Sequence, residues 1–302
     1  PVGSDFGLDG DEGAVFGGTE FGQTEDAVVE VLEEHGEGPN GGVTQSLLSR
    51  FIACRERFRI HTIEGLRQAP TFSHRMEYGQ MWHVCEETLA SGKEPVSTRW
   101  GFALEEYCQD LAKKYRDQQS QVWHWHNVCK VQFPHYVAWW AKHPDVRNRI
   151  PLMQEQVFNV PYELPSGRNV RLRGKWDGVD LIGKGKDAMI YLQENKTKGD
   201  IDEGQMRKQL QFDLQTGFYI AALDLYLKNQ TAPAIQQRIG TSVAGVRYNV
   251  IRRPLAGGKN SIRKREPSKS NPRGESDEEF YARLSHLIAE DPGWYFMRWR
   301  VE

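Results

Sequence analysis

The first 49 residues of this chain of 302 contain no lysine or arginine, although the whole chain has 39 of them. No apolar run approaches the roughly 20 residues that a membrane-spanning helix needs, so we expect no membrane association. Only four cysteines are present, which is too few for a disulfide framework in a chain of this length. The scarcity of cysteine favours a reducing, intracellular compartment.

The charges that are present are unevenly distributed. The first 49 residues contain eleven acidic side chains, so residues 50–302 carry 39 basic and 30 acidic ones, a net charge of +9 within a chain of net charge −2. Residues 1–42 are rich in glycine and acidic side chains, unlike a secretory or mitochondrial targeting segment, and predict a flexible leader. A basic body of this kind is typical of proteins that work on nucleic acids.

The leader contains one helical pattern and allows three roles. Residues 25–34 have the spacing of a short amphipathic helix. The leader could cover a basic nucleic-acid channel, recruit a basic partner, or act as a solubilising tail. We expect residues 43–302 to form the folded domain.

The periodicity of apolar residues predicts a helical first half of the domain. Thr44 or Ser46 can cap a helix that runs to His61, and further helices fit residues 75–91, 98–119 and 121–142. The last of these is rich in tryptophan, phenylalanine and tyrosine, which we expect to form core.

Strand patterns follow. We expect strands at 154–164, 170–182, 188–196, 243–251 and 295–301, with a Pro-Ser-Gly turn between the first two. A helix from Asp202 or Glu203 to Lys228, a basic loop at 252–273 and a capped helix from Ser276 to Glu290 complete the pattern. The order predicts one α/β domain with a mixed central sheet flanked by helices and a helical N-terminal part.

The ends of the second and third strands carry chemically informative side chains. Asp177 lies in the second strand, and Glu194 and Lys196 end the third with their side chains on one face. Two carboxylates brought together repel each other unless a cation lies between them, and oxygen ligands suit Mg²⁺ or Mn²⁺. Lys196 can stabilise charge on a phosphate, and the Asn195 carbonyl is a further candidate ligand.

The Asp…Glu-x-Lys pattern resembles that of the PD-(D/E)XK nuclease superfamily. Gln215 and Tyr219 resemble the QxxxY motif of its RecB-like branch, and the segment around His83 resembles that branch's helix with a metal-binding histidine. Residues 46–60 resemble its opening motif, and residues 248–254 with 278–301 resemble the tail of phage-encoded RecB-like exonucleases. The resemblance spans roughly residues 44–301.

This resemblance implies a restriction-endonuclease-like core and a metal-dependent DNA nuclease. The expected activity is that of an exonuclease in phage-type recombination, replication or repair, which hydrolyses phosphodiester bonds with metal-activated water. One or two Mg²⁺ or Mn²⁺ ions would be held by His83, Asp177, Glu194 and the Asn195 carbonyl. Lys196 would assist the attack, and Gln215 and Tyr219 would contact a phosphate or orient the lysine.

Further residues are candidates with smaller roles. Glu87, one helical turn after His83, would orient that histidine, and Glu155 would add a carboxylate. Backbone contacts to DNA, with little sequence specificity, are predicted for Arg171, Arg173, Arg252 and Arg253. Some relatives hold an iron–sulfur cluster, but no cysteine follows Cys129, so we expect no cluster and a buried, apolar role for Cys54.

Two other functions share these features. A DNA-binding or recruiting module would keep the fold without useful catalysis, and an endonuclease would cut closed circular DNA. A single-strand annealing or recombination protein is a possible partner, and an oligomer is compatible with the sequence. The compartment expected is the cytoplasm, which is the host's if the protein is phage-encoded.

Overall fold

The computed structural model describes residues 42–66, 69–90, 99–143, 149–229, 243–254 and 262–301. Contacts between residues divide the chain into Pro1–Gly42 and Val43–Glu302, and the second unit holds all the elements described below. The helix predicted at residues 25–34 and part of the predicted basic loop, 255–261, lie outside the described residues. No helix in the described ranges is long and apolar enough to cross a membrane.

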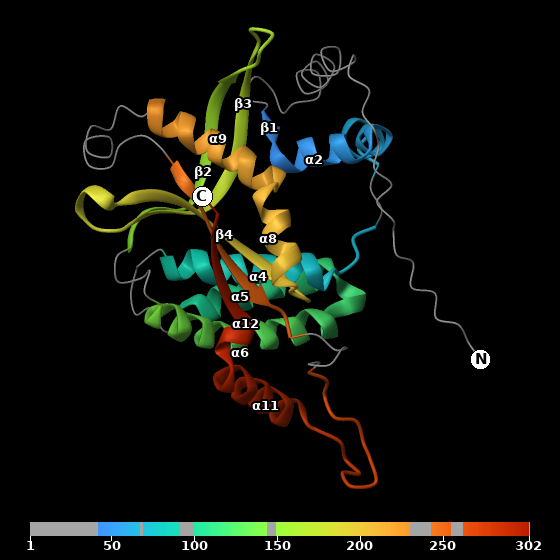
Figure 1. Ribbon diagram of the computed structural model, residues 1–302. Helices are drawn as coiled ribbons and strands as arrows, with labels where there is room; N and C mark the ends of the chain where they lie inside the picture. Colours follow the sequence, from blue (N-terminus) through green and yellow to red (C-terminus); the bar gives the residue numbers. More distant parts are fainter. Residues whose placement is uncertain are drawn as a thin grey trace. The chain divides into compact units, whose positions relative to one another are not determined.

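A six-stranded mixed sheet forms the centre of this unit, as predicted (Figure 1). Its path runs β1, β3, β4, β5, β6, and β2 pairs with β3. The β1–β3 and β4–β5 pairs are parallel and the other three pairs are antiparallel. The strands are β1 (Val43–Thr44), β2 (Arg149–Glu163), β3 (Asn169–Ile182), β4 (Met189–Lys198), β5 (Val243–Arg252) and β6 (Phe296–Val301).

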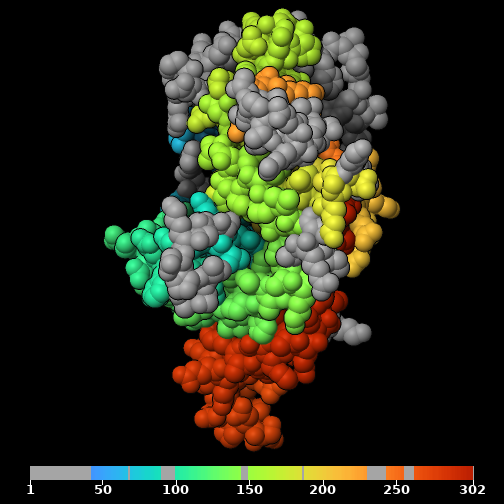
Figure 2. Space-filling model, turned by 90° about the vertical axis from the view of Figure 1, so that its left-hand side faces the viewer, coloured from blue at the N-terminus to red at the C-terminus, as the bar shows by residue number. Residues whose placement is uncertain are grey.

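The β2–β3 hairpin is the longest ladder and projects from the rest of the sheet in Figure 1, and its tip lies at the top of the view in Figure 2. The predicted turn is confirmed: Gly167 has a φ of 82° and its N–H donates to the Leu164 carbonyl at 2.9 Å. A left-handed φ of this kind favours glycine. The first strand begins at Arg149, five residues earlier than predicted, because the ladder with β3 continues past an irregularity between Pro151 and Met153.

Helices cover both faces of the sheet. On one side α4 (His74–Ala90) contacts β2 and β4 and packs on α5 (Arg99–Lys114) and α6 (Gln119–Lys142). On the other side lie α8 (Glu203–Gln211) and α9 (Leu214–Asn229), with α2 (Gln45–Ala53) against α9 (Figure 1). Successive residues of β5 divide between these layers: Tyr248 and Val250 belong to the α8–α9 core, whereas Ile251 belongs to the α4–α6 core.

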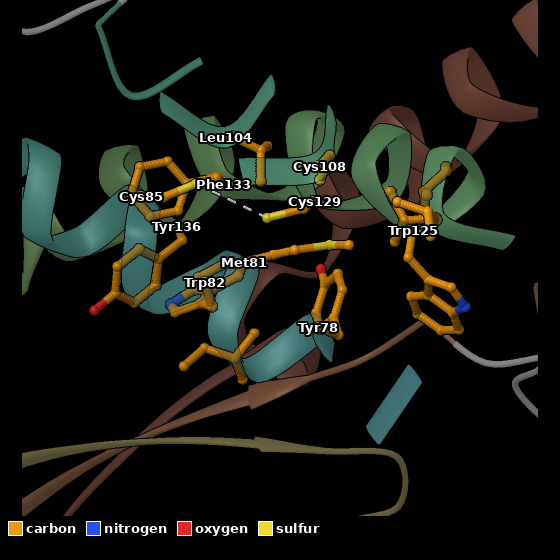
Figure 3. Close-up of a cluster of buried hydrophobic side chains, with 14 of the residues drawn as sticks. Tyr78, Met81, Trp82, Cys85, Leu104, Cys108, Trp125, Cys129, Phe133 and Tyr136 are labelled. Carbon is orange, nitrogen blue, oxygen red and sulfur yellow. Dashed lines mark hydrogen bonds between the residues drawn. The ribbon is translucent and has the colours of Figure 1, made fainter. Parts of the chain in front are cut away.

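The core on the α4–α6 side is aromatic, as predicted for the aromatic-rich helix (Figure 3). Trp82 of α4 is fully buried and packs edge-on against Phe133 and Tyr136 of α6. Helix α11 (Asp277–Glu290) packs on α6 and begins with the predicted cap at Ser276, as a reciprocal capping box with Glu279. These contacts fix the position of α4 relative to the sheet.

The first predicted helix is interrupted. Thr44 caps α2, but α2 ends at Ala53, and Cys54 has an extended backbone. The Cys54 sulfur accepts the Arg57 N–H at 3.4 Å and so caps α3 (Arg55–Phe58), which continues as a π-helical segment, Arg59–Ile63. The prediction that Cys54 is buried is therefore wrong, because this capping position exposes it.

The long helix predicted from Asp202 to Lys228 is also interrupted. Asp202 caps α8 as expected, but α8 ends at Gln211 and α9 begins at Leu214. Between them the Asp213 carboxylate accepts the Thr216 hydroxyl at 3.0 Å, a local bond that competes with helix continuation. Because of this break, α9 begins as a separate helix just before Gln215. At the chain's end, a short helix, α12 (Pro292–Tyr295), precedes β6.

Candidate functional site

The site lies where strands β3 and β4 diverge. Their pairing ends at Gly178 opposite Gln193, and β1 reaches β3 only at Leu172 and Arg173. In the described sheet, residues 174–177 therefore pair with neither β1 nor β4 along this edge. Asp177 lies at this fork, and its Oδ2 accepts the Asn195 backbone N–H at 2.7 Å. The predicted approach of Asp177 to the end of the third strand is confirmed.

Helix α4 brings His83 to the fork. Gly79 lies one turn before His83, and a Cβ atom added to it would be only 3.3 Å from Thr197 Oγ1 on β4. The absence of a side chain at Gly79 thus lets α4 pack closely on the end of β4. His83 Nδ1 is 3.6 Å from Asp177 Oδ1 and 3.6 Å from Glu155 Oε1.

Glu155 completes this cluster from β2. Its side chain is 5% exposed, and one ligand atom each from His83, Glu155 and Asp177 lie within 4.8 Å of one another. Of the described non-glycine residues, only Glu155 has a positive φ, at 48°. A non-glycine residue held in the left-handed region costs roughly 1–3 kcal/mol, and such residues concentrate at functional sites. The strained backbone places this carboxylate opposite Asp177.

Lys196 belongs to a second group at the same fork. Its Nζ donates to Glu194 Oε2 at 3.1 Å and to Gln215 Oε1 at 2.6 Å. Gln215 Nε2 in turn donates to Glu194 Oε2 at 3.3 Å. Glu194 is 1% exposed, whereas the Lys196 side chain is 17% exposed, so the triangle is reached by solvent from the lysine side. The predicted residues Glu194, Lys196 and Gln215 are thus brought together by β4 and the first turn of α9.

Tyr219 lies one turn further along α9, where its hydroxyl interacts with the Gln215 side chain. Burial, aided by the nearby charge of Glu194, raises the pKa of Tyr219 to about 12. The ring packs edge-on against Phe158 of β2. A Cβ atom on Gly174 would be 2.6 Å from the Phe158 ring and 3.2 Å from the Tyr219 ring, so the glycine leaves room for both.

The protonation of the site reflects its excess of buried carboxylates. Burial raises the pKa of Glu194 to about 8, Asp177 adds to the shift, and Lys196 opposes it. Burial by itself lowers the pKa of His83, but the charges of Asp177 and Glu155 outweigh it and raise the pKa to about 9. Burial also raises the pKa of Asp177, against the effect of His83. A bound cation would relieve this accumulation of negative charge.

The unsatisfied atoms fit a divalent metal ion. Glu155 Oε1 and Glu194 Oε1 are buried and have no hydrogen-bond partner among the described residues. Buried acceptors without a partner are costly, and ligation would satisfy them. Glu155 lies in one cluster with Asp177 and His83, a hard, oxygen-rich donor set of the kind that suits Mg²⁺ or Mn²⁺.

Two other predicted residues lie beside this cluster. Asn195 is buried, and its side-chain oxygen accepts the Asn249 amide at 2.8 Å. Ligation by the Asn195 backbone carbonyl stays a prediction. Glu87 pairs with Lys175 at 3.0 Å, so its contact in this structure is to that lysine and not to His83.

The four predicted arginines are distributed over two regions. Arg171 is on the hairpin and donates to Asn159, and Arg173 lies where β1 meets β3. Arg252 and Arg253 are only 7% and 6% exposed. Arg252 stacks on the Trp294 ring, and Arg253 donates to the His74 carbonyl at 3.2 Å. Arg252 and Arg253 therefore both make contacts inside the domain, and their contacts with DNA stay predictions.

Sequence reasoning missed two charged residues at the site. Lys175 Nζ is 2.8 Å from Glu155 Oε2. Its spacing of two residues from Asp177 on one strand is a signal that could have identified it. Glu86, three residues after His83 on α4, is half-buried; desolvation raises its pKa, and it is hydrogen-bonded to Tyr136. Its signal was the segment around His83, which ends in Glu86 and Glu87 and resembles the family's histidine helix.

Comparison with known families agrees with this geometry. The family model described as PD-(D/E)XK nuclease superfamily matches residues 43–294. A comparison with curated proteins gives no match. The matched range includes the diverging strands, the histidine of α4 and the glutamine of α9. This chain therefore belongs to the PD-(D/E)XK nuclease superfamily, whose members hydrolyse phosphodiester bonds with the help of divalent metal ions.

Proposed function

We propose that this protein is an Mg²⁺- or Mn²⁺-dependent DNA exonuclease of phage-type recombination, replication or repair. The observation that supports nuclease chemistry is the meeting of the His83–Glu155–Asp177 cluster with the Lys196–Glu194–Gln215 triangle at one fork of the sheet. The exonuclease and phage assignments rest on the resemblance of Gln215, Tyr219 and the closing segment to RecB-like phage exonucleases.

The ligands in this proposal are His83, Asp177, Glu155 and Glu194, with the Asn195 carbonyl as a further donor. When bound, the divalent ion polarises the scissile phosphate and lowers the pKa of a water molecule. Glu194 has a second task, because its Oε2 holds the Lys196 ammonium at 3.1 Å. The ligand set and the lysine are therefore coupled through one side chain.

Lys196 would act on the phosphate and the attacking water. Water adds to phosphorus, one P–O ester bond breaks, and the departing oxygen takes a proton. The Lys196 ammonium, fixed by Glu194 and Gln215, stabilises the negative charge that develops on the phosphate oxygens. Tyr219, which interacts with Gln215, would orient that amide or contact a phosphate of the same strand.

Contacts to the DNA backbone would come from basic side chains outside the site. The hairpin residue Arg171 and the neighbouring Arg173 precede Asp177 on β3. Phosphate contacts carry no sequence information, so we propose little sequence specificity and a strong dependence on salt concentration. The net charge of +9 over residues 50–302 supports this mode of binding.

The decisive experiment is digestion of DNA labelled at the 5′ or the 3′ end, as linear and as closed circular molecules, with Mn²⁺ or with EDTA. The wild-type protein should degrade linear DNA from an end with Mn²⁺ only. Lys196→Met should bind DNA and fail to cleave it. Lys130→Met serves as the control, because Lys130 is an exposed residue of α6.

The same digestion separates the alternatives. Cleavage of circular DNA would indicate an endonuclease. No cleavage of any DNA by the wild-type protein would contradict the proposal and favour a DNA-binding or recruiting module. Full activity of Lys196→Met would refute the role given to that lysine.

The setting of the reaction follows from the phage-type assignment. We propose that the enzyme works in the cytoplasm, beside a single-strand annealing or recombination protein that receives its product. We also propose that residues 1–42 form a part separate from the nuclease domain at 43–302, and that their carboxylates compete with DNA for the basic body. An oligomer that encloses its DNA is compatible with exonuclease action, and light scattering with and without DNA would test it.

A further inference from the structure

Lys175 provides a positive charge next to the proposed metal centre. It lies on β3, two residues before Asp177, and its Nζ is 2.8 Å from Glu155 Oε2 and 3.0 Å from Glu87 Oε2. An ammonium group between two carboxylates occupies a position where a second cation would otherwise be held. None of the roles assigned above requires this lysine.

The buried carboxylates of the site share one pattern. Each has one oxygen held by a group of the chain: Asp177 Oδ2 accepts the Asn195 N–H at 2.7 Å, Glu194 Oε2 accepts Lys196 at 3.1 Å, and Glu155 Oε2 forms an ion pair with Lys175 at 2.8 Å. The other oxygens, Asp177 Oδ1, Glu155 Oε1 and Glu194 Oε1, remain as ligands. Of these, Asp177 Oδ1 and Glu155 Oε1 lie in the compact cluster with His83, which is a donor set for a single ion.

A site for two metal ions would need more free ligand atoms than this single donor set. In two-metal sites the ions lie about 3.5–4 Å apart and clamp both sides of the reacting phosphate. A carboxylate that bridges two ions through both of its oxygens needs both of them free, and here each of the three has one oxygen held by a group of the chain. The ammonium of Lys175 would also repel a second ion at close range.

We propose that Lys175 is a positioning residue that restricts this site to one divalent ion. It does so by engaging the second oxygen of Glu155 and by filling the space between Glu155 and Glu87. The inference rests on the proposed metal centre and adds the number of ions that it holds.

The surroundings of the pair support a stable arrangement. Glu155 is 5% exposed, so its pair with Lys175 is shielded from solvent on one side, and the carboxylate is kept in place despite a φ of 48°. The Glu87 side chain is 57% exposed and can move with the lysine. Removing the ammonium would leave two carboxylates facing each other around an open position, which is a new cation site.

The test counts ions directly, without a nuclease assay. Mn²⁺ is titrated into the metal-free protein and free Mn²⁺ is followed by electron paramagnetic resonance, with calorimetry as a second measurement. We expect one ion per chain for wild type and for the control Lys130→Ala, and two for Lys175→Ala. The double variant Lys175→Ala with Glu87→Gln should return to one, because the new site loses a ligand.

The outcomes distinguish this inference from the proposed function. Two ions in the wild-type protein, or a single ion in a folded Lys175→Ala variant, would overturn the role of Lys175 while leaving a metal-dependent nuclease in place. A wild-type protein that binds no Mn²⁺ at all would overturn the metal centre itself. Circular dichroism of each variant verifies folding, and the wild-type count decides the number of ions even if a variant fails to fold.

Discussion

Raising the pH from 7 to 8 should greatly increase the affinity of this protein for Mn²⁺. In the metal-free protein, His83 has a pKa of about 9, since the charges of Asp177 and Glu155 outweigh the opposing effect of burial. Burial and the charge of Asp177 raise the pKa of Glu194 to about 8. A metal ion binds only the deprotonated forms, so it must displace both protons.

The size of the effect follows from these two values. At pH 7 a group with a pKa of about 9 is deprotonated in about 1% of molecules, and one with a pKa of about 8 in about 10%. If the two groups titrate independently, the fraction ready to bind a metal rises about 50-fold between pH 7 and pH 8. About two protons should be released for each ion bound at pH 7.

Calorimetry in two buffers with different protonation enthalpies measures both the Kd and the proton release. The His83→Gln variant lacks one of the two titrating groups and should bind Mn²⁺ more weakly than wild type. Its affinity should rise only about fivefold between pH 7 and pH 8. A wild-type Kd that is the same at pH 7 and pH 8, with no proton release, would refute the electrostatic description of the site.

Four further predictions concern stability and the leader. Because the folded-state pKa values of both ligands are raised, the metal-free protein should lose stability as pH rises, from 4.5 to about 8 through Glu194 and from 6.5 to about 9 through His83. Its Tm measures this loss, and Mn²⁺ should offset it. Gly174→Ala should cost about 1–3 kcal/mol in chemical denaturation, because its Cβ would lie 2.6 Å from the buried ring of Phe158. Asp180→Ala should cost about 3–5 kcal/mol by the same measurement, since it removes the carboxylate paired with the fully buried Arg247. Deleting residues 1–42 should tighten DNA binding and steepen its salt dependence, and an unchanged affinity would leave the leader a solubilising role.

The part of the site that is local in sequence could be predicted. Asp177, Glu194 and Lys196 lie on two strands joined by a short connection, so alternation and pairing already placed them at one edge. His83 and Gln215 lie far from them along the chain, and only the resemblance to a family pattern connected them to the same site. The general order of helices and strands, and the mixed sheet, also followed from periodicity.

The remaining features depend on tertiary structure. Glu155 joins the site through a left-handed φ that no local pattern requires. Arg252 and Arg253 begin a segment rich in basic residues, yet the packing of Trp294 and His74 against them keeps them buried. The interruptions at Cys54 and between α8 and α9 arise from side-chain bonds to nearby groups, which compete with helix formation at single residues.

The two cores of this domain have a consequence for its heat sensitivity. His83 follows the fully buried Trp82 in the α4–α6 core, whereas Gln215 starts the helix that covers the opposite face. The site is complete only while both helical layers are packed on the sheet. Partial opening of the α4–α6 layer would remove His83 from the carboxylates, and partial opening of the α8–α9 layer would remove Gln215 from Lys196. Inactivation on warming should therefore precede melting, and conservative core substitutions in either layer should yield conditional mutants that are active only in the cold.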